Sequence, residues 1–329
     1  MNILYAIQGT GNGHIARAED VIPVLKNYGK LDIFVSGAQA DIALSYPVRY
    51  KSKGLSFYFG KSGSIDFVKT FKKNSSKDVY KQIKDFPVKK YDLIINDFEP
   101  ISAWAARKRE VPCVALSHQS ALLSHKVPRP KSFDPVGEWV LKNYAPADHH
   151  VGIHFANFDK NIFTPVIRST IRNSKTERGD HYTVYLPAYD DRKLVPLLAK
   201  IKGQRWHIFS KHARKPYHIG KLSVYPVNNQ EFVSSMVSSR GVLCGAGFET
   251  PAESLFLGKK LLVVPMKKQY EQHYNAAALR ELGIPVVKKM RKKNLEKVIK
   301  WIESEQQVEI DYPDVTEKMV ETAMKLGGF

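Results

Sequence analysis

The chain has 329 residues, 43% of them hydrophobic, and its 51 Lys and Arg exceed its 32 Asp and Glu to give a net charge of +19. This length favours two domains, and the hydrophobic content excludes a disordered chain. The longest apolar runs, such as residues 261–265, are too short to span a membrane.

Apolar, β-rich runs alternate with helical patterns in the first half of the chain. This alternation is typical of βαβ units in a parallel sheet. We predict strands at residues 2–8, 31–37, 91–97 and 111–118, and helices at 15–28, 38–46 and 101–110.

The polar, poorly periodic stretch at residues 156–181 resembles a linker, and the alternation then begins again. We predict strands at 181–187, 205–211, 221–227, 241–247 and 260–265, and helices at 191–201, 231–239, 250–258 and 272–283. Asp314 and Glu317 have capping-box spacing before a last helix that runs to Gly327. The predicted fold is α/β, with two Rossmann-like doubly wound domains that face a central cleft.

The first predicted domain covers residues 1–160 and is followed by a linker at 161–180. Residues 181–312 form the second predicted domain. Residues 313–329 form a C-terminal helix, for which packing back on the N-terminal domain is one arrangement. Ligands in such sheets bind at the carboxyl ends of the strands.

A glycine-rich loop, GTGNGH at residues 9–14, follows the first strand. Its spacing is not GxGxxG, no acidic residue closes the second strand, and no GK[ST] follows, so neither a dinucleotide nor a Walker-type site is indicated. His14 begins the next helix, whose N-terminus disfavours the imidazolium form and keeps the ring available as a base. The alternative is that His14 only caps this helix.

A second glycine turn opens the segment at residues 245–283, which resembles the donor-binding segment of two-domain, GT-B type glycosyltransferases. The resemblance is greatest to the peptidoglycan lipid-intermediate N-acetylglucosaminyltransferase group (family 28) and to the family-1 sugar transferases. The shared pattern is a glycine turn, a glutamate, a G-x6-P strand, an acidic-Gln pair and a final Asn-Ala.

This resemblance implies a metal-independent, inverting transfer of a hexosyl or N-acetylhexosaminyl group from a nucleoside-diphosphate donor, foremost a UDP-sugar. The group would pass to an acceptor hydroxyl, for which a lipid or a cell-envelope glycan is a candidate. Backbone N–H groups of the helix near Thr250 would hold the diphosphate, and Glu253 the ribose hydroxyls. Taken alone, Glu253 is equally well explained as a solvated helix residue. The implied donor-binding residues are Ser210, Gly245, Gly247, Phe248, Glu249, Thr250, Glu253, Glu271, Gln272 and Asn275.

The same resemblance makes residues 1–160 the acceptor-side domain and residues 181–312 the nucleotide-sugar-binding domain. It assigns the first glycine loop to the acceptor side. Gly11, Asn12 and Gly13 would line it, with His14 as the general base and Asp97 as the carboxylate that orients the ring. Asp97 is alternatively a strand-end cap. His118 and Gln119 match the acceptor-facing turn of the lipid-intermediate enzymes. We expect these two residues to position the acceptor more than to take part in the reaction.

Two positions depart from the family-1 pattern and leave the donor undefined. Gly245 stands where a histidine usually contacts the diphosphate, and Glu249 where Asn is common. Two other functions therefore stay open: a nonhydrolysing nucleotide-sugar epimerase, and a non-catalytic protein that binds nucleotide sugars or nucleic acid.

The positive charge and the two cysteines indicate partners and compartment. Residues 51–90 hold eleven Lys and three Asp and include Phe57, Tyr58, Phe59, Phe67 and Phe71. With residues 121–133, they make an anionic membrane surface a candidate partner, whereas nucleic acid is disfavoured because no recognition motif is present. The chain has two cysteines, Cys113 and Cys244, and no disulfide framework, which favours a cytoplasmic protein, with the cytoplasmic face of the membrane as a candidate location. We expect no metal site and no cofactor beyond the sugar donor.

Overall fold

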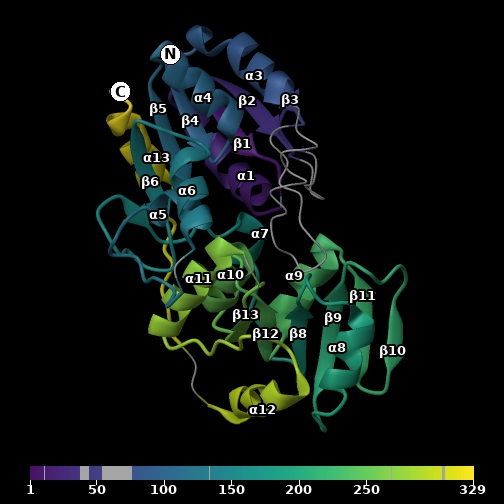
Figure 1. Cartoon of the computed structure of the whole chain (residues 1–329). Coiled ribbons are helices and arrows are strands. Elements are labelled where there is room, and N and C mark those ends of the chain that lie inside the picture. Colours follow the sequence, from purple (N-terminus) through teal and green to yellow (C-terminus); the bar gives the residue numbers. More distant parts are fainter. Residues whose placement is uncertain (11, 38–43, 54–75, 133, 268, 306–307) are drawn as a thin grey trace. The chain divides into compact units, whose positions relative to one another are not determined.

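The computed structural model describes residues 1–10, 12–37, 44–53, 76–132, 134–267, 269–305 and 308–329 (Figure 1). The chain forms two compact units. The first consists of Met1–Val127, Lys131–Arg168 and Pro313–Phe329, and the second of Pro128–Pro130 and Ser169–Tyr312.

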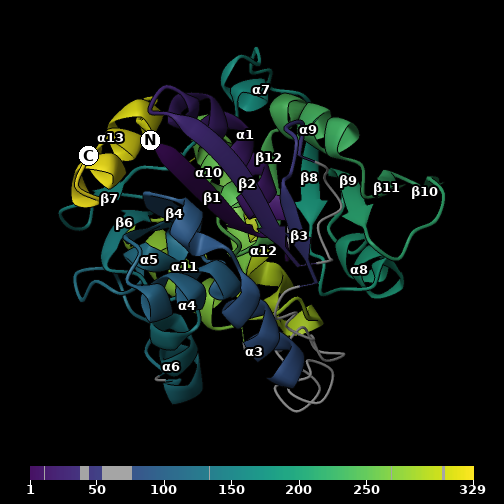
Figure 2. The ribbon, with the colours of Figure 1, turned by 90° about the horizontal axis from the view of Figure 1, so that it is seen from above.

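The first unit is built on a seven-stranded parallel sheet in the order β3-β2-β1-β4-β5-β6-β7 (Figure 2). Its central strands are apolar and fully buried, as expected for a parallel sheet that is covered on both faces. The order reverses beside β1, and ligands bind at such a switch point in open α/β sheets. The strands are β1 (Asn2–Gln8), β2 (Lys30–Ser36), β3 (Tyr50–Ser52), β4 (Leu93–Asp97), β5 (Cys113–Ser117), β6 (His149–Ile153) and β7 (Ile162–Phe163).

The helices of the first unit begin at local capping groups. The Glu99 carboxylate accepts hydrogen bonds from the N–H groups of Ile101 and Ser102 at the start of α4, and the Asp314 carboxylate accepts one from the N–H of Thr316 at the start of α13. The helices are α1 (Asn12–Lys26), α3 (Ser76–Asp85), η1 (Val88–Lys90), α4 (Pro100–Arg109), α5 (His118–Ala121), α6 (Pro135–Asn143) and α13 (Thr316–Leu326).

The last helix, α13, belongs to the first unit although it is last in the sequence. It packs against α1 and β6 and buries Met319, Val320, Ala323 and Met324. The spacing of these four residues puts them on one helical face, which explains why this segment is held against an apolar surface.

The second unit contains a six-stranded sheet in the order β10-β11-β9-β8-β12-β13. All pairs are parallel except the edge pair of β10 and β11, and Tyr182, Trp206 and Trp301 lie in the core on one face. The strands are β8 (His181–Tyr185), β9 (Arg205–Ser210), β10 (Tyr217–Ile219), β11 (Leu222–Pro226), β12 (Gly241–Gly245) and β13 (Lys260–Val264). The helices are α7 (Ser169–Arg172), α8 (Asp191–Leu198), α9 (Asn229–Ser238), α10 (Glu249–Phe256), α11 (Tyr270–Glu281), η2 (Lys292–Asn294) and α12 (Leu295–Glu303).

These two sheets confirm the predicted fold class of two Rossmann-like domains. Several local predictions differ from the structure. Helix α1 begins at Asn12 and not at residue 15, and Ile162–Phe163, in the predicted linker, pairs with β6. Strands β3, β6 and β10 and helices α3, α5, α6, α7 and α12 were not predicted. The predicted helix at 38–46 falls mostly outside the described residues.

The two segments predicted to meet a membrane are only partly described. Residues 54–75, which carry the five aromatic residues named above, lie outside the described residues, and so does Phe133. Of the apolar residues at 121–133, Ala121, Leu122 and Val127 are at most 1% exposed, and the membrane surface stays a prediction. No helix among the described residues combines the length and the apolarity that a membrane span needs.

Candidate functional site

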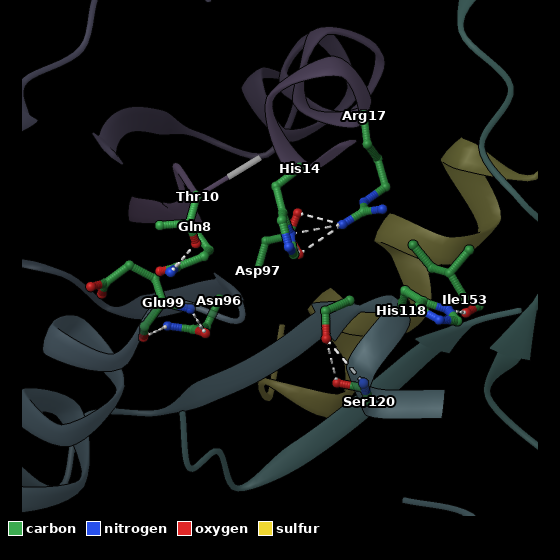
Figure 3. A network of polar contacts seen from close by, with 11 residues as sticks. Gln8, Thr10, His14, Arg17, Asn96, Asp97, Glu99, His118, Ser120 and Ile153 are labelled. Atoms are coloured by element: carbon green, nitrogen blue, oxygen red, sulfur yellow. Dashed lines mark hydrogen bonds and ion pairs between the residues drawn. The ribbon is translucent and has the colours of Figure 1, made fainter. Parts of the chain in front are cut away.

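The first candidate site lies where β1 and β4 end side by side. Asp97 is the last residue of β4 and pairs in register with Ile7 of β1, and His14 lies in the first turn of α1. The His14 Nδ1 atom is 2.8 Å from the Asp97 Oδ1 atom (Figure 3). Asp97 is fully buried, whereas 14% of the His14 side chain is exposed. The structure therefore brings together the two residues that the sequence indicated as base and carboxylate.

A third residue, Arg17, joins this pair and was not predicted. Its Nη2 atom lies 2.8 Å from each Asp97 carboxylate oxygen and 3.1 Å from the His14 Nδ1 atom. Residues three positions apart share a face of a helix, and only 3% of the Arg17 side chain is exposed. Arg17 lies between Ala16 and Ala18, which are also buried in α1. These small apolar neighbours could have indicated from the sequence that the arginine points inward.

The carboxylate decides where the imidazole carries its hydrogen. An ionised carboxylate only accepts hydrogen bonds, so the His14 Nδ1 atom donates and the Nε2 atom bears the lone pair. Burial raises the pKa of the Asp97 carboxyl, but the Arg17 guanidinium and His14 outweigh burial and hold that pKa below its ordinary value. Asp97 is therefore ionised at neutral pH, and the His14 Nε2 atom is suited to accept a proton.

The turn after β4 fixes Asp97 in place. The Asn96 side chain donates to the Glu99 carbonyl (2.8 Å) and accepts from the Glu99 N–H (2.9 Å). Phe98, between them, has a φ of 58°, a left-handed conformation that costs energy for a residue other than glycine. Such strained residues cluster at functional sites, where the surrounding hydrogen bonds maintain them.

The predicted acceptor-side residues differ in their surroundings. Gly11 lies outside the described residues, and Asn12 and Gly13 are partly exposed in the first turn of α1. His118 does not end a strand as predicted: it begins α5, which Ser117 caps by accepting from the N–H of Ser120.

The side chain of His118 points toward Ile153 in Figure 3. Its Nδ1 atom donates to the Ile153 carbonyl at 2.8 Å, and only 2% of the residue is exposed. Gln119 lines a cavity of about 230 Å³ within the first unit, together with Asn96, Phe98, Arg107, Ser120 and Lys142 among others.

The second candidate site is the turn between β12 and α10. An added Cβ at Gly247 would meet no atom within 4 Å, and one at Gly245 would meet only the Gln272 side chain at ordinary contact distances. Neither glycine has a positive φ. By contrast, a Cβ at Gly241 would lie 2.7 Å from the Lys260 carbonyl oxygen. Nothing in the described fold requires glycine at 245 and 247, and their bare backbone permits the close approach of a ligand.

Two of the predicted donor-binding side chains support this turn. The Asn275 amide donates to the Ala246 carbonyl at 3.1 Å and is fully buried. The Gln272 Oε1 atom accepts from the N–H of Met266 at 2.9 Å. Both side chains therefore have roles in holding the loops after β12 and β13.

The remaining residues that were predicted to bind the donor lie in or beside α10, at the start of α11 and at the end of β9. Phe248 occupies the N-cap of α10, Glu249 and Thr250 form its first turn and are partly exposed, and Glu253 is 2% exposed; Glu271 is partly exposed at the start of α11. Ser210, at the end of β9, is 4% exposed. Its hydroxyl donates to Asp191 at 2.6 Å and accepts from the N–H of His212 at 3.1 Å, so it takes part in the internal network of the unit.

No group of His, Cys, Asp and Glu side chains able to hold a metal ion was found in the part of the chain that the structure describes. The first unit thus contains a buried carboxylate paired with a histidine, and the second unit contains a glycine turn before a helix.

Comparison with solved structures gives 281 matching chains, and the three that follow are each at most 16% identical to this chain. MurG of Acinetobacter baumannii is 14% identical with a TM-score of 0.57, and the match covers 100% of this chain and 99% of MurG. UGT2 of Phytolacca americana, solved with UDP-2-fluoroglucose and pterostilbene, is 16% identical with a TM-score of 0.59, covering 99% and 93%. UGT89C1 of Arabidopsis thaliana, solved with UDP, is 14% identical with a TM-score of 0.58, covering 98% and 94%.

These likenesses establish the fold, and a family model establishes the family. A search of curated protein sequences gives no match. The model of glycosyl transferase family 1, however, matches residues 1–304, which include both candidate sites. The chain therefore belongs to glycosyl transferase family 1 and is a glycosyltransferase.

Proposed function

We propose that this glycosyltransferase moves a sugar from a UDP-sugar to an acceptor hydroxyl, with inversion at the anomeric carbon and without a metal ion. The observation that carries the donor proposal is the bare turn at Gly245 and Gly247, which the described fold itself does not require. Two of the solved structures that share the fold contain UDP or a UDP-sugar analogue, which supports the same donor class.

The diphosphate is proposed to bind at the first turn of α10. Helix N-termini present N–H groups and a positive dipole end to anions. Phe248 at the N-cap has no side-chain oxygen for these N–H groups, and the side-chain-free glycines before it leave room for phosphate oxygens. Glu253, one turn further along α10, accepts the ribose hydroxyls in this proposal.

The reaction is proposed to begin at His14. Its Nε2 atom takes the proton of the acceptor hydroxyl as the oxygen attacks the anomeric carbon, and UDP leaves from the opposite face, which inverts the configuration. Asp97 holds the ring through Nδ1 at 2.8 Å and stabilises the imidazolium that forms. The acceptor itself is not identified, and an anionic membrane surface remains a predicted partner through the lysines of residues 51–90.

UDP is expected to stabilise the protein in EDTA as well as in magnesium, because the proposed site uses backbone groups and no metal. At a hundredfold excess over its dissociation constant, UDP should add about 2.7 kcal/mol to the free energy of unfolding. Gly247→Ala should reduce UDP affinity by about 1–3 kcal/mol, since the added methyl group occupies space that the phosphates need. Thermal unfolding with increasing UDP measures both effects.

The matched variants separate ligand binding from folding. Gly247→Ala should unfold at the wild-type temperature or slightly above it when no ligand is present, because its Cβ meets no atom within 4 Å. Gly241→Ala should instead unfold at a lower temperature, because its Cβ would lie 2.7 Å from a backbone oxygen. Unchanged UDP affinity in Gly247→Ala would contradict the proposed phosphate site.

A further inference from the structure

Asp97 has two cationic or potentially cationic partners, and this distinguishes it from the carboxylate of a simple histidine–aspartate pair. Both carboxylate oxygens lie 2.8 Å from Arg17 Nη2, and Oδ1 also lies 2.8 Å from His14 Nδ1. Arg17 is always protonated, and it is 3% exposed while Asp97 is fully buried. The charge of the carboxylate is therefore balanced before His14 gains a proton.

We propose that Arg17 is a positioning residue that keeps His14 in its neutral, Nδ1-protonated form. In a simple pair, a buried carboxylate favours the imidazolium. Here a proton on His14 Nε2 would make the imidazole ring positive, and its Nδ1 atom lies 3.1 Å from the Arg17 Nη2 atom. Two cations would then share one carboxylate. Arg17 thus opposes protonation of the free enzyme, while its hydrogen bonds hold the carboxylate oxygen that orients the ring. The inference rests on the proposed role of His14 as the base.

The other titratable groups near His14, Arg17 and Asp97 are neutral, bonded to backbone N–H groups or partly exposed. On β1, burial and then Asp97 raise the pKa of Tyr5 well above its ordinary value, so Tyr5 is neutral. After β4, Glu99 accepts from the N–H groups at the start of α4. On α1, Glu19 accepts from the N–H of Ser45, and Asp20 is partly exposed.

In the described part of the chain, α13 packs against α1 without adding a buried charge. Helix α13 buries apolar side chains, while Glu317, Lys318, Glu321 and Lys325 are exposed, and on α5 His118 Nδ1 donates to the Ile153 carbonyl. Asp97 thus accepts the hydrogen of His14 Nδ1, and the Arg17 Nη2 atom, which lies 3.1 Å from that nitrogen, donates to the Asp97 carboxylate.

The test is nitrogen NMR of the imidazole side chains in the ligand-free protein, with the His14 signals assigned by their loss in His14→Ala. The wild type should show the hydrogen on Nδ1 at neutral pH. Arg17→Met should raise the pKa of His14 by about 1–3 pH units. The double variant Arg17→Met with Asp97→Asn should restore the wild-type pKa, because both charges are removed together. Lys26→Met removes an exposed charge from the last turn of the same helix and should change nothing.

A hydrogen on Nε2 in the wild type, or a His14 pKa that is unchanged in Arg17→Met, would overturn the proposal. If Arg17→Met does not fold, the wild-type tautomer and the double variant still decide, since a raised pKa in the double variant also contradicts it. None of these readouts needs sugar transfer, so a failure here is distinct from a failure of the proposed reaction. Where transfer is measured, Arg17→Met should move the acidic limb of the rate profile to higher pH.

Discussion

His14→Ala is expected to lower the turnover number by about 10²–10⁴-fold, which is the usual contribution of a general base. The acceptor hydroxyl must lose its proton as it attacks, and the proposed site for that proton is the His14 Nε2 atom, since Nδ1 donates to Asp97. UDP affinity should be kept, because the proposed phosphate site lies in residues of the second unit. Single-turnover transfer together with UDP titration measures the two effects separately.

His125→Ala is a suitable control, because His125 is exposed and also belongs to the first unit. It should transfer sugar at the wild-type rate. Wild-type turnover in His14→Ala would show that His14 has only a structural role, as a residue of the first turn of α1.

Asp97→Ala is expected to lower the free energy of unfolding by about 3–5 kcal/mol, because it leaves the buried Arg17 guanidinium without its partner. Asp97→Asn keeps the shape and one acceptor oxygen, so its loss should be smaller. Urea unfolding at neutral pH measures both. Asp85→Ala, at an exposed position of α3, should stay within about 0.5 kcal/mol of the wild type.

The same pair predicts how acid affects stability. The pKa of Asp97 is lower in the folded protein than its ordinary value of 3.8, so the unfolded chain binds this proton more readily. The contribution is therefore complete above about pH 4 and is lost as the pH falls through the folded-state pKa. Asp97→Ala should show a weaker loss of stability in acid than the wild type, and an identical loss would contradict the assigned ion pair.

The sequence predicted the fold well because its strands are strongly apolar and alternate with helices. The pairing of His14 with Asp97 came from the family resemblance. The fold accounts for it, because His14 lies in the helix after β1, Asp97 ends β4, and parallel neighbouring strands bring their carboxyl ends to one edge. The edge strand β10 was missed because it has only three residues and pairs antiparallel across a turn at Gly220, whose φ is 58°. Nothing in βαβ periodicity predicts such a hairpin.

The contacts of polar side chains were harder to predict than their positions. Arg17 was overlooked because an arginine on an amphipathic helix is usually solvated, and only the tertiary fold buries it. Gln272 and Asn275 are the residue types that the family pattern requires. Their bonds to Met266, just before α11, and to Ala246, after β12, depend on the tertiary fold. His118 was placed at a strand end since the capping role of Ser117 is expressed only once the chain turns.

The central claim is tested most directly by incubating the protein in EDTA with a panel of nucleoside-diphosphate sugars and following the products by mass spectrometry and NMR. The account predicts slow release of UDP and free sugar from a UDP-sugar, with water as a poor acceptor, and loss of this release in His14→Ala. Conversion of the donor to its epimer without release of UDP, or no reaction and no binding with any nucleotide sugar, would contradict it.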